Sequence, residues 1–166
     1  MMEPGEALGI AAQIAVALAG FAGVVVVFRR EAVHEWTGVD KLRLRLLLAN
    51  SILPLGLSMV GLVLLTIKPA PPGIWRCCSG ILLVATVAFA TAITRSFRRL
   101  NVQNVQRQRV TQLMFFLFGA FGMASMFLQL YNIALPGVFW PFFAGIVYQL
   151  VTAMAQFARM ILLLPE

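Results

Sequence analysis

The sequence predicts an all-α integral membrane protein, built as a bundle of five transmembrane helices. Of its 166 residues, 61% are hydrophobic and 11% are charged, whereas a soluble domain carries about a quarter charged residues. A water-soluble fold of this size cannot bury so much apolar surface, so lipid must cover the excess. The apolar residues also gather in five runs, which are continuous rather than alternating and therefore favour helices over a β-barrel.

The five runs approach or exceed the roughly 20 residues that a helix needs to cross a bilayer. The polar loops between them are too short to enclose a core, so the whole chain, residues 1–166, is expected to form one transmembrane domain with no soluble domain. No Gly or Pro interrupts residues 81–118, so the third and fourth helices are expected to extend and meet in a turn between Asn101 and Asn104. The predicted spans are residues 7–28, 46–67, 77–94, 113–135 and 138–164.

The loops between the runs differ in positive charge, and this difference predicts the orientation. The second loop carries two basic residues and the fourth carries none, so the two arginine-rich loops are expected on the cytoplasmic side. The N-terminus then lies outside and the C-terminus in the cytoplasm, as in a bacterial cytoplasmic (inner) membrane. The aromatic residues expected at the outer interface are Trp75, Tyr131 and Trp140. The basic residues of the first and third loops are Arg29, Arg30, Lys41, Arg43 and Arg45, and Arg95, Arg98, Arg99, Arg107 and Arg109.

Small residues recur at every fourth position of the first run, which contains the stretch "AQIAVALAGFAG". Positions four apart lie along one ridge of a helix, and a ridge of small residues lets a second backbone approach closely. The first interpretation is that this ridge packs inside the chain's own bundle, and the alternative is contact with another subunit. The predicted ridge consists of Ala7, Ala11, Ala15, Ala19 and Gly23.

Acidic residues and histidine are absent from the predicted spans. All six Asp and Glu lie outside them, and the one histidine, His34, lies in the first loop. Proton- and cation-coupled transporters place such groups within the membrane, and Ser-His-Asp or Cys-His catalysis needs a histidine in the site. We therefore expect no catalytic residue, no cofactor and no metal. Glu31, His34 and Glu35 share a spacing that metals sometimes use, but such triplets are common on solvated helix faces.

The adjacent Cys77 and Cys78 are the most reactive side chains of the sequence. They lie at the predicted outer end of the third span, beside Arg76, whose charge favours the thiolate. Membrane thiol oxidases relay electrons through Cys-x-x-Cys pairs, and this chain has no such pair. We expect both cysteines to be passive interfacial residues, with a thiol-redox membrane enzyme as the alternative.

Two further groups of polar residues are singled out. Gln149 and Gln156 are seven residues apart and share a helix face, either as interhelical hydrogen-bonding groups or as the lining of a narrow neutral pathway. The arginines beside the third loop are expected to contact anionic phospholipid headgroups. These arginines are Arg98, Arg99, Arg107 and Arg109.

The sequence thus favours a non-catalytic, multi-pass membrane protein that acts as a scaffold, accessory or assembly subunit of a membrane complex or a homo-oligomer. The alternative is a small oligomeric pore or carrier for a neutral or anionic solute. The expected partners are the lipid bilayer with its anionic phospholipids, and other membrane subunits or further copies of the chain. Nucleic acid is not expected, because the basic clusters lie beside hydrophobic runs rather than along one basic face.

Overall fold

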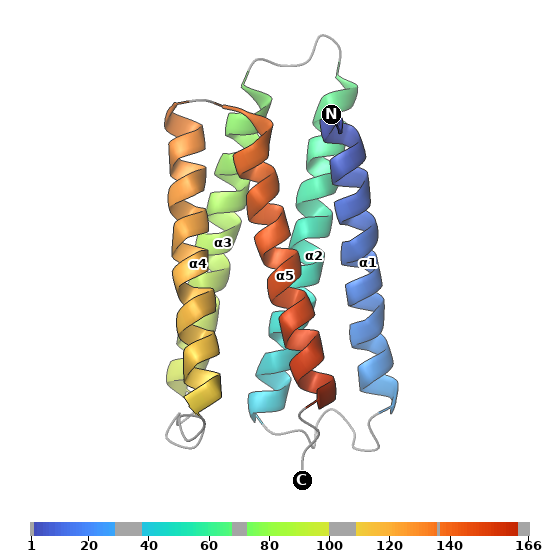
Figure 1. Cartoon of the computed structure of the whole chain (residues 1–166), viewed down its shortest axis with the longest axis vertical. Helices are drawn as coiled ribbons and strands as arrows, with labels where there is room; N and C mark the ends of the chain where they lie inside the picture. The colour runs from blue at the N-terminus through green and yellow to red at the C-terminus, as the bar shows by residue number, and fades with distance from the viewer. Residues whose placement is uncertain (1, 29–37, 68–72, 100–108, 136, 163–166) are drawn as a thin grey trace. The chain divides into compact units, whose positions relative to one another are not determined.

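The computed structural model describes residues 2–28, 38–67, 73–99, 109–135 and 137–162. Every regular element in this part of the chain is an α-helix. Each of the five helices is long and apolar enough to cross a membrane, which confirms the helical architecture predicted from the five apolar runs. The helices are α1 (Pro4–Phe28), α2 (Gly38–Thr66), α3 (Ile74–Arg99), α4 (Arg109–Ala134) and α5 (Phe139–Leu162) (Figure 1).

Four helices are longer than the apolar runs that predicted them, and the first of them, α1, begins at Pro4 instead of residue 7. α2 begins at Gly38 instead of residue 46, α4 begins at Arg109 instead of residue 113, and α3 continues to Arg99. Polar residues that favour helix continue each element beyond its apolar part, since hydropathy locates the span rather than the helix end. The turn expected between Asn101 and Asn104 lies outside the described residues.

Contacts divide the chain into two compact units. The first unit contains residues 1–74 and 149–166, and the second contains residues 75–148. α1, α2 and the C-terminal part of α5 therefore belong to the first unit. α3, α4 and the N-terminal part of α5 belong to the second.

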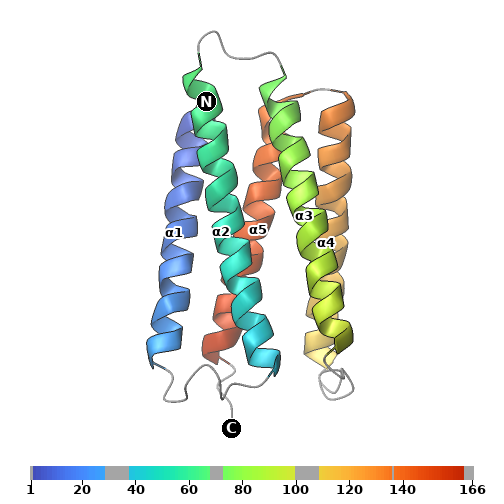
Figure 2. The same cartoon turned by 180° about the vertical axis from the view of Figure 1, so that it is seen from behind.

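In the first unit, α1 and α2 run antiparallel side by side (Figures 1 and 2). Near their shared end, a Cβ on Gly5 would lie 3.9 Å from the Cδ1 atom of Leu65. At the other end of α1, the ring of Phe21 stacks on that of Phe157 in α5, with centroids 5.4 Å apart. The buried face of α1 consists of Ala7, Leu8, Ala11, Ala15, Leu18 and Ala22.

Pro54 lies inside α2 without ending the helix. Proline lacks the N–H that would bond to the carbonyl four residues earlier, and a membrane helix tolerates this loss where other groups satisfy the backbone nearby. In the preceding turn, Asn50 Nδ2 donates to the Leu46 carbonyl and Ser51 Oγ donates to the Leu47 carbonyl. The polar side chains beside the proline are thus bonded within their own helix.

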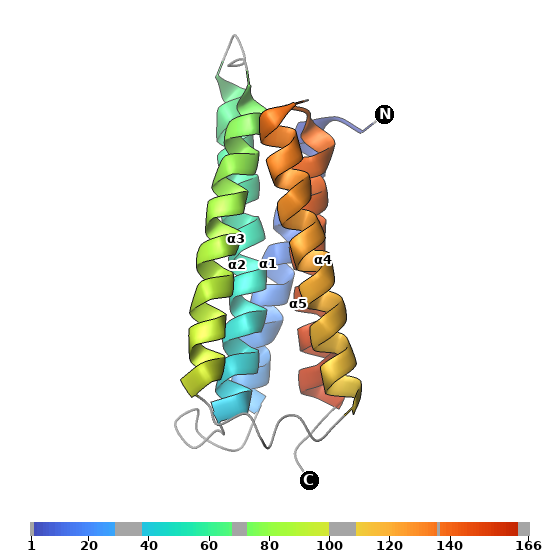
Figure 3. The same cartoon turned by 90° about the vertical axis from the view of Figure 1, so that its left-hand side faces the viewer.

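In the second unit, the start of α3, the end of α4 and the start of α5 lie at the same end (Figure 3). Aromatic rings gather there: Trp75 meets Phe139 edge to face at 4.8 Å and stacks on Phe142 at 6.0 Å. Below this cluster the apolar core contains Leu82 of α3 and Ile146 of α5, both almost fully buried. The ring contacts hold the start of α3 against the start of α5.

Candidate functional site: a polar cluster that joins three helices

Three polar side chains of α4 lie with Gly122 on one face of the helix. Gly122, Ser125, Gln129 and Asn132 follow one another at intervals of three, four and three residues, which is the spacing of a single helical face. Gln129 and Asn132 are 1% and 0% exposed. This face meets α5, and at its upper end it also meets α3.

Asn132 bonds to both neighbouring segments. Its Nδ2 atom donates to Ser79 Oγ of α3 at 2.8 Å and to the Val138 carbonyl at 3.0 Å. Its Oδ1 atom accepts from the Val138 backbone N–H at 2.9 Å. One amide therefore fixes α3 against the end of α4 and the approach to α5.

The turn between α4 and α5 is closed by the same residue and by an arginine. The Gly137 N–H donates to the Asn132 carbonyl, and Gly137 has φ near +60°, a conformation that favours glycine. Arg76 of α3 donates from Nη2 to the Leu135 carbonyl at 2.8 Å. A cation at the C-terminal end of α4 is favoured by the helix dipole as well as by this hydrogen bond.

One turn further along α4, Gln129 bonds to α5. Its Nε2 atom donates to the Pro141 carbonyl at 2.8 Å. Gly145 makes room for this contact, since a Cβ there would lie 2.9 Å from Gln129 Nε2 and 2.5 Å from Leu82 Cδ2. Gln129 Oε1 is buried and accepts no hydrogen bond from the described part of the chain.

The last link of the cluster is Tyr148. Its hydroxyl donates to the Phe118 carbonyl of α4 at 2.7 Å. Gly122 again makes the space, because a Cβ at that position would lie 2.9 Å from the Tyr148 hydroxyl oxygen. Neutral donors and carbonyl acceptors of this kind fix helices together.

The residues of the predicted small-residue ridge divide between two environments. Ala7, Ala11 and Ala15 are 4%, 3% and 0% exposed, whereas Ala19 is half-buried and Gly23 is exposed. The buried face of α1 instead continues through Leu18 to Ala22. Because the helix has 3.6 residues per turn, each position four residues on lies a little further around the helix axis, and a row with strict four-residue spacing gradually leaves the buried face.

Gln149 and Gln156 are buried in the first unit, at 3% and 8% exposure. Thr152 lies between them on the same face of α5 and is also buried. In the same unit, Ser58 of α2 is fully buried, and its hydroxyl has no hydrogen-bond partner among the described residues. Whether the glutamines act as hydrogen-bonding groups or as a lining stays a prediction.

The two cysteines are free thiols in different surroundings: Cys77 is exposed and Cys78 is fully buried. Arg107 and His34 lie outside the described residues, as do the side chains of Arg98, Arg99 and Arg109. Within the described ranges, no three His, Cys, Asp or Glu residues come together as a metal-binding group.

Sequence reasoning missed three members of the polar cluster: Ser79, Asn132 and the capping residue Arg76. Asn132 lies inside the predicted fourth span, 113–135, but was not singled out there, and the structure places it in the last turn of α4. The signal that would have found it is its spacing from Ser125 and Gln129. For Ser79 and Arg76 the sequence holds no comparable signal, since their partners lie 53 and 59 residues away.

Comparison with known proteins gave no relative: no family model, no curated protein and no solved structure matches the chain.

Proposed function

We propose that this chain is a non-catalytic, multi-pass protein of a bacterial cytoplasmic membrane, where it acts as a scaffold, accessory or assembly subunit of a membrane complex or a homo-oligomer. The observation that carries the proposal is the use of polar side chains in the second unit. Asn132, Gln129 and Tyr148 each bond one helix to another segment of the bundle. In lipid, such bonds hold helices together. The predicted spans also contain no acidic residue and no histidine, the groups on which ion-coupled transport depends.

The proposed orientation has the N-terminus outside and the C-terminus in the cytoplasm. Two features support it. The arginine-rich first and third loops require the same side of the membrane. The exposed Tyr131 and Trp140 and the half-buried Trp75 belong to the ends of α3, α4 and α5 that meet at one end of the second unit, as in an aromatic belt at a membrane interface.

Labelling of the cysteines tests the orientation. A membrane-impermeant maleimide added to intact cells should label the exposed Cys77, while the buried Cys78 stays unlabelled until the protein is denatured. The Cys77→Ser variant provides the control, because it leaves Cys78 alone and should stay dark. A cysteine introduced at Asn101, in a background without the native pair, should be labelled only after the cells are permeabilised. Labelling of the Asn101 position in intact cells would reverse the orientation, and loss of function in the double serine variant would favour the thiol-redox alternative.

Assembly and transport measurements test the scaffold role. Chemical cross-linking in native membranes, followed by sizing in mild detergent, should place the chain in a complex with other subunits or with further copies of itself. Liposomes that contain the wild-type protein should show no flux of water, small neutral solutes or halide above the protein-free background. A chain that migrates alone after cross-linking would contradict the proposal.

A small pore or carrier for a neutral or anionic solute is the second candidate. Gln149, Thr152 and Gln156 form a buried polar row, and the fully buried Ser58 hydroxyl lies in the same unit without a partner in the described ranges. The double variant Gln149→Leu, Gln156→Leu distinguishes the two candidates. Wild-type flux that disappears in this variant, while the assembly stays intact, would favour the pore over the scaffold.

The buried face of α1 gives a matched pair of variants for the assembly measurement. Ala15 is fully buried, whereas Ala17, two residues further on, is exposed. Replacing Ala15 and Ala19 by leucine should crowd the helix contact at a cost of about 1–3 kcal/mol and weaken the bundle of the first unit. Ala17→Leu should leave that bundle unchanged. If Ala17→Leu instead releases the chain from its complex, the exposed side of α1 is the contact with the other subunit.

A further inference from the structure

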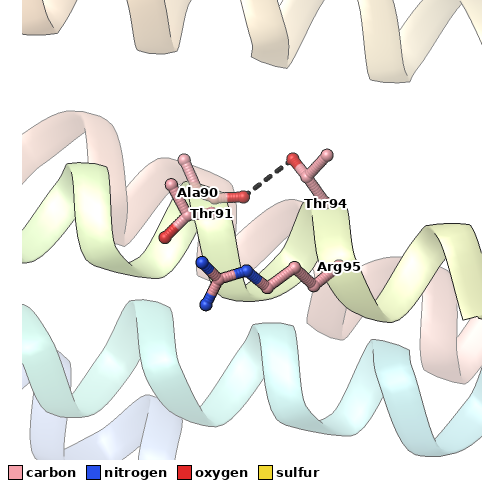
Figure 4. A pocket seen from close by; sticks show the side chains of 4 residues that line it. All are labelled: Ala90, Thr91, Thr94 and Arg95. Atoms are coloured by element: carbon pink, nitrogen blue, oxygen red, sulfur yellow. Dashed lines mark hydrogen bonds between the residues drawn. The ribbon is translucent and has the colours of Figure 1, made fainter.

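A cavity of about 300 Å³ lies beside α3, near the end of its span (Figure 4). Ala90, Thr91, Thr94 and Arg95 line it. The cavity is open to the outside, and its volume is at the lower end of the range of small-molecule sites, about 300–1,000 Å³. Arg95 is also the last residue of the part of α3 that is long and apolar enough to cross a membrane, Ile74–Arg95, so with the chain inserted as proposed the cavity is at headgroup depth.

Arg95 brings a positive charge to this cavity. Its side chain is exposed and forms no hydrogen bond or ion pair within the chain's described residues. The guanidinium turns back along α3 and lies on the same side of the helix as the Thr91 hydroxyl (Figure 4), as expected of helical side chains, which point toward the N-terminus. A guanidinium at the edge of the hydrocarbon region attracts an anion, and its planar fork suits a phosphate.

The two threonines present acceptors rather than donors. Thr91 Oγ1 donates its hydrogen to the Ala88 carbonyl at 2.8 Å, and Thr94 Oγ1 donates to the Ala90 carbonyl at 2.8 Å. Each hydroxyl has one hydrogen, so only its lone pairs stay available to a ligand. The cavity therefore combines a cation for a phosphate with acceptors for hydroxyl groups.

We propose that this cavity binds the headgroup of an anionic phospholipid that carries free hydroxyls, as phosphatidylglycerol does. The lipid phosphate contacts the guanidinium of Arg95, and a headgroup hydroxyl donates to Thr91 Oγ1. Choline has no hydrogen-bond donor for the threonine and brings a positive charge beside Arg95, and ethanolamine also brings a positive charge. The site depends on insertion of the chain into a membrane, the first part of the proposed function, and is independent of the scaffold role.

Native mass spectrometry of the full chain in mild detergent tests this site. With an equimolar mixture of phosphatidylglycerol and phosphatidylcholine, the wild type should retain phosphatidylglycerol preferentially. Arg95→Gln should lower this preference about fivefold, the effect of one basic residue near anionic lipid. The control is Arg45→Gln, which removes the same charge from an exposed position of α2 away from the cavity and should lower the preference less.

The Thr91→Val variant tests the hydroxyl contact. It retains Arg95, so it should still prefer anionic lipids to phosphatidylcholine. It should lose the preference of the wild type for phosphatidylglycerol over phosphatidylmethanol, an anionic lipid whose headgroup has no hydroxyl. An unchanged preference would remove Thr91 from the site.

Three results would overturn the proposal: a wild type that retains both lipids equally, equal losses in Arg95→Gln and Arg45→Gln, or displacement of the lipid by excess inorganic phosphate. The first excludes the site, the second assigns binding to general surface charge, and the third assigns the cavity to free phosphate. If Arg95→Gln does not fold, the lipid mixture and the phosphate competition on the wild type still decide the question. Failure of the cross-linking experiment alone speaks against the scaffold and leaves the lipid site standing.

Discussion

In the second unit, side chains of one helix bond to another helix, whereas the buried face of α1 in the first unit is made mostly of alanine. Asn132 and Gln129 are almost fully buried and reach the neighbouring segments of the bundle. In the first unit, Asn50 and Ser51 are equally buried but return their hydrogen bonds to their own helix. Buried polar side chains therefore bond to another segment in the second unit, whereas Asn50 and Ser51 in the first unit bond to their own helix.

With the chain in a membrane, as proposed, the comparison illustrates two ways in which apolar helices associate in lipid. Hydrophobicity does not drive their association, because lipid tails are as apolar as leucine, so close packing and interhelical hydrogen bonds must do so. α1 presents small residues to the interior of its unit, while α4 presents a row of amides and hydroxyls to α5. The second unit also uses small residues, at Gly122, Gly137 and Gly145, where a Cβ would collide with a polar side chain.

The largest effect is expected from filling the space at Gly145. The side chain of Gly145→Val would collide with Leu82 Cδ2 and Gln129 Nε2, at 2.5 Å and 2.9 Å from the Cβ position. We expect a loss of up to about 3 kcal/mol in the free energy of unfolding, measured by titrating detergent micelles with sodium dodecyl sulfate. Gly119→Val is the matched control, since a Cβ at Gly119 meets nothing within 4 Å. Equal losses in the two variants would show that the second unit does not depend on this close approach.

A matched pair of asparagines compares the units directly. Asn132→Leu removes three hydrogen bonds and leaves the Val138 N–H without its acceptor, at an expected cost of about 2 kcal/mol. Asn50→Leu removes one bond to a carbonyl of its own helix and should cost clearly less. The same unfolding titration measures both, and a larger loss for Asn50→Leu would invert the comparison.

The next effect is a coupling between Gly122 and Tyr148. Tyr148→Phe removes the hydroxyl that donates to the Phe118 carbonyl and should cost about 1 kcal/mol. Gly122→Ala places a Cβ 2.9 Å from the same hydroxyl and should destabilise the wild type by displacing it. In the Tyr148→Phe background, Gly122→Ala should be close to neutral. Additive losses in the double-mutant cycle would show that the two residues do not interact.

Part of this arrangement was readable from the sequence and part was not. Continuous apolar runs predicted all five helices because the bilayer imposes one length and one backbone conformation on each span. The buried positions Ala7, Ala11 and Ala15 follow from four-residue spacing, a local property. The partner of Asn132 could not be predicted from local spacing, because nothing within α4 specifies that this residue bonds to Ser79, which lies 53 residues earlier. The sequence did not predict the cavity at Arg95 either. An arginine beside a loop indicates the orientation of the chain in the membrane and does not by itself indicate a binding site.

The smallest effect separates two fully buried serines, one in each unit. Ser79 accepts the hydrogen bond of Asn132, whereas the Ser58 hydroxyl has no partner among the residues described. Ser79→Ala should cost about 0.6 kcal/mol, the average of an interhelical hydrogen bond in a membrane protein, because Asn132 keeps its bonds to Val138. Ser58→Ala should cost nothing or stabilise slightly, since it removes a buried hydroxyl that is not hydrogen-bonded. Loss of stability in Ser58→Ala would mean that its hydroxyl has a partner in the membrane, and loss of solute flux in that variant would place Ser58 on a polar pathway and favour the pore.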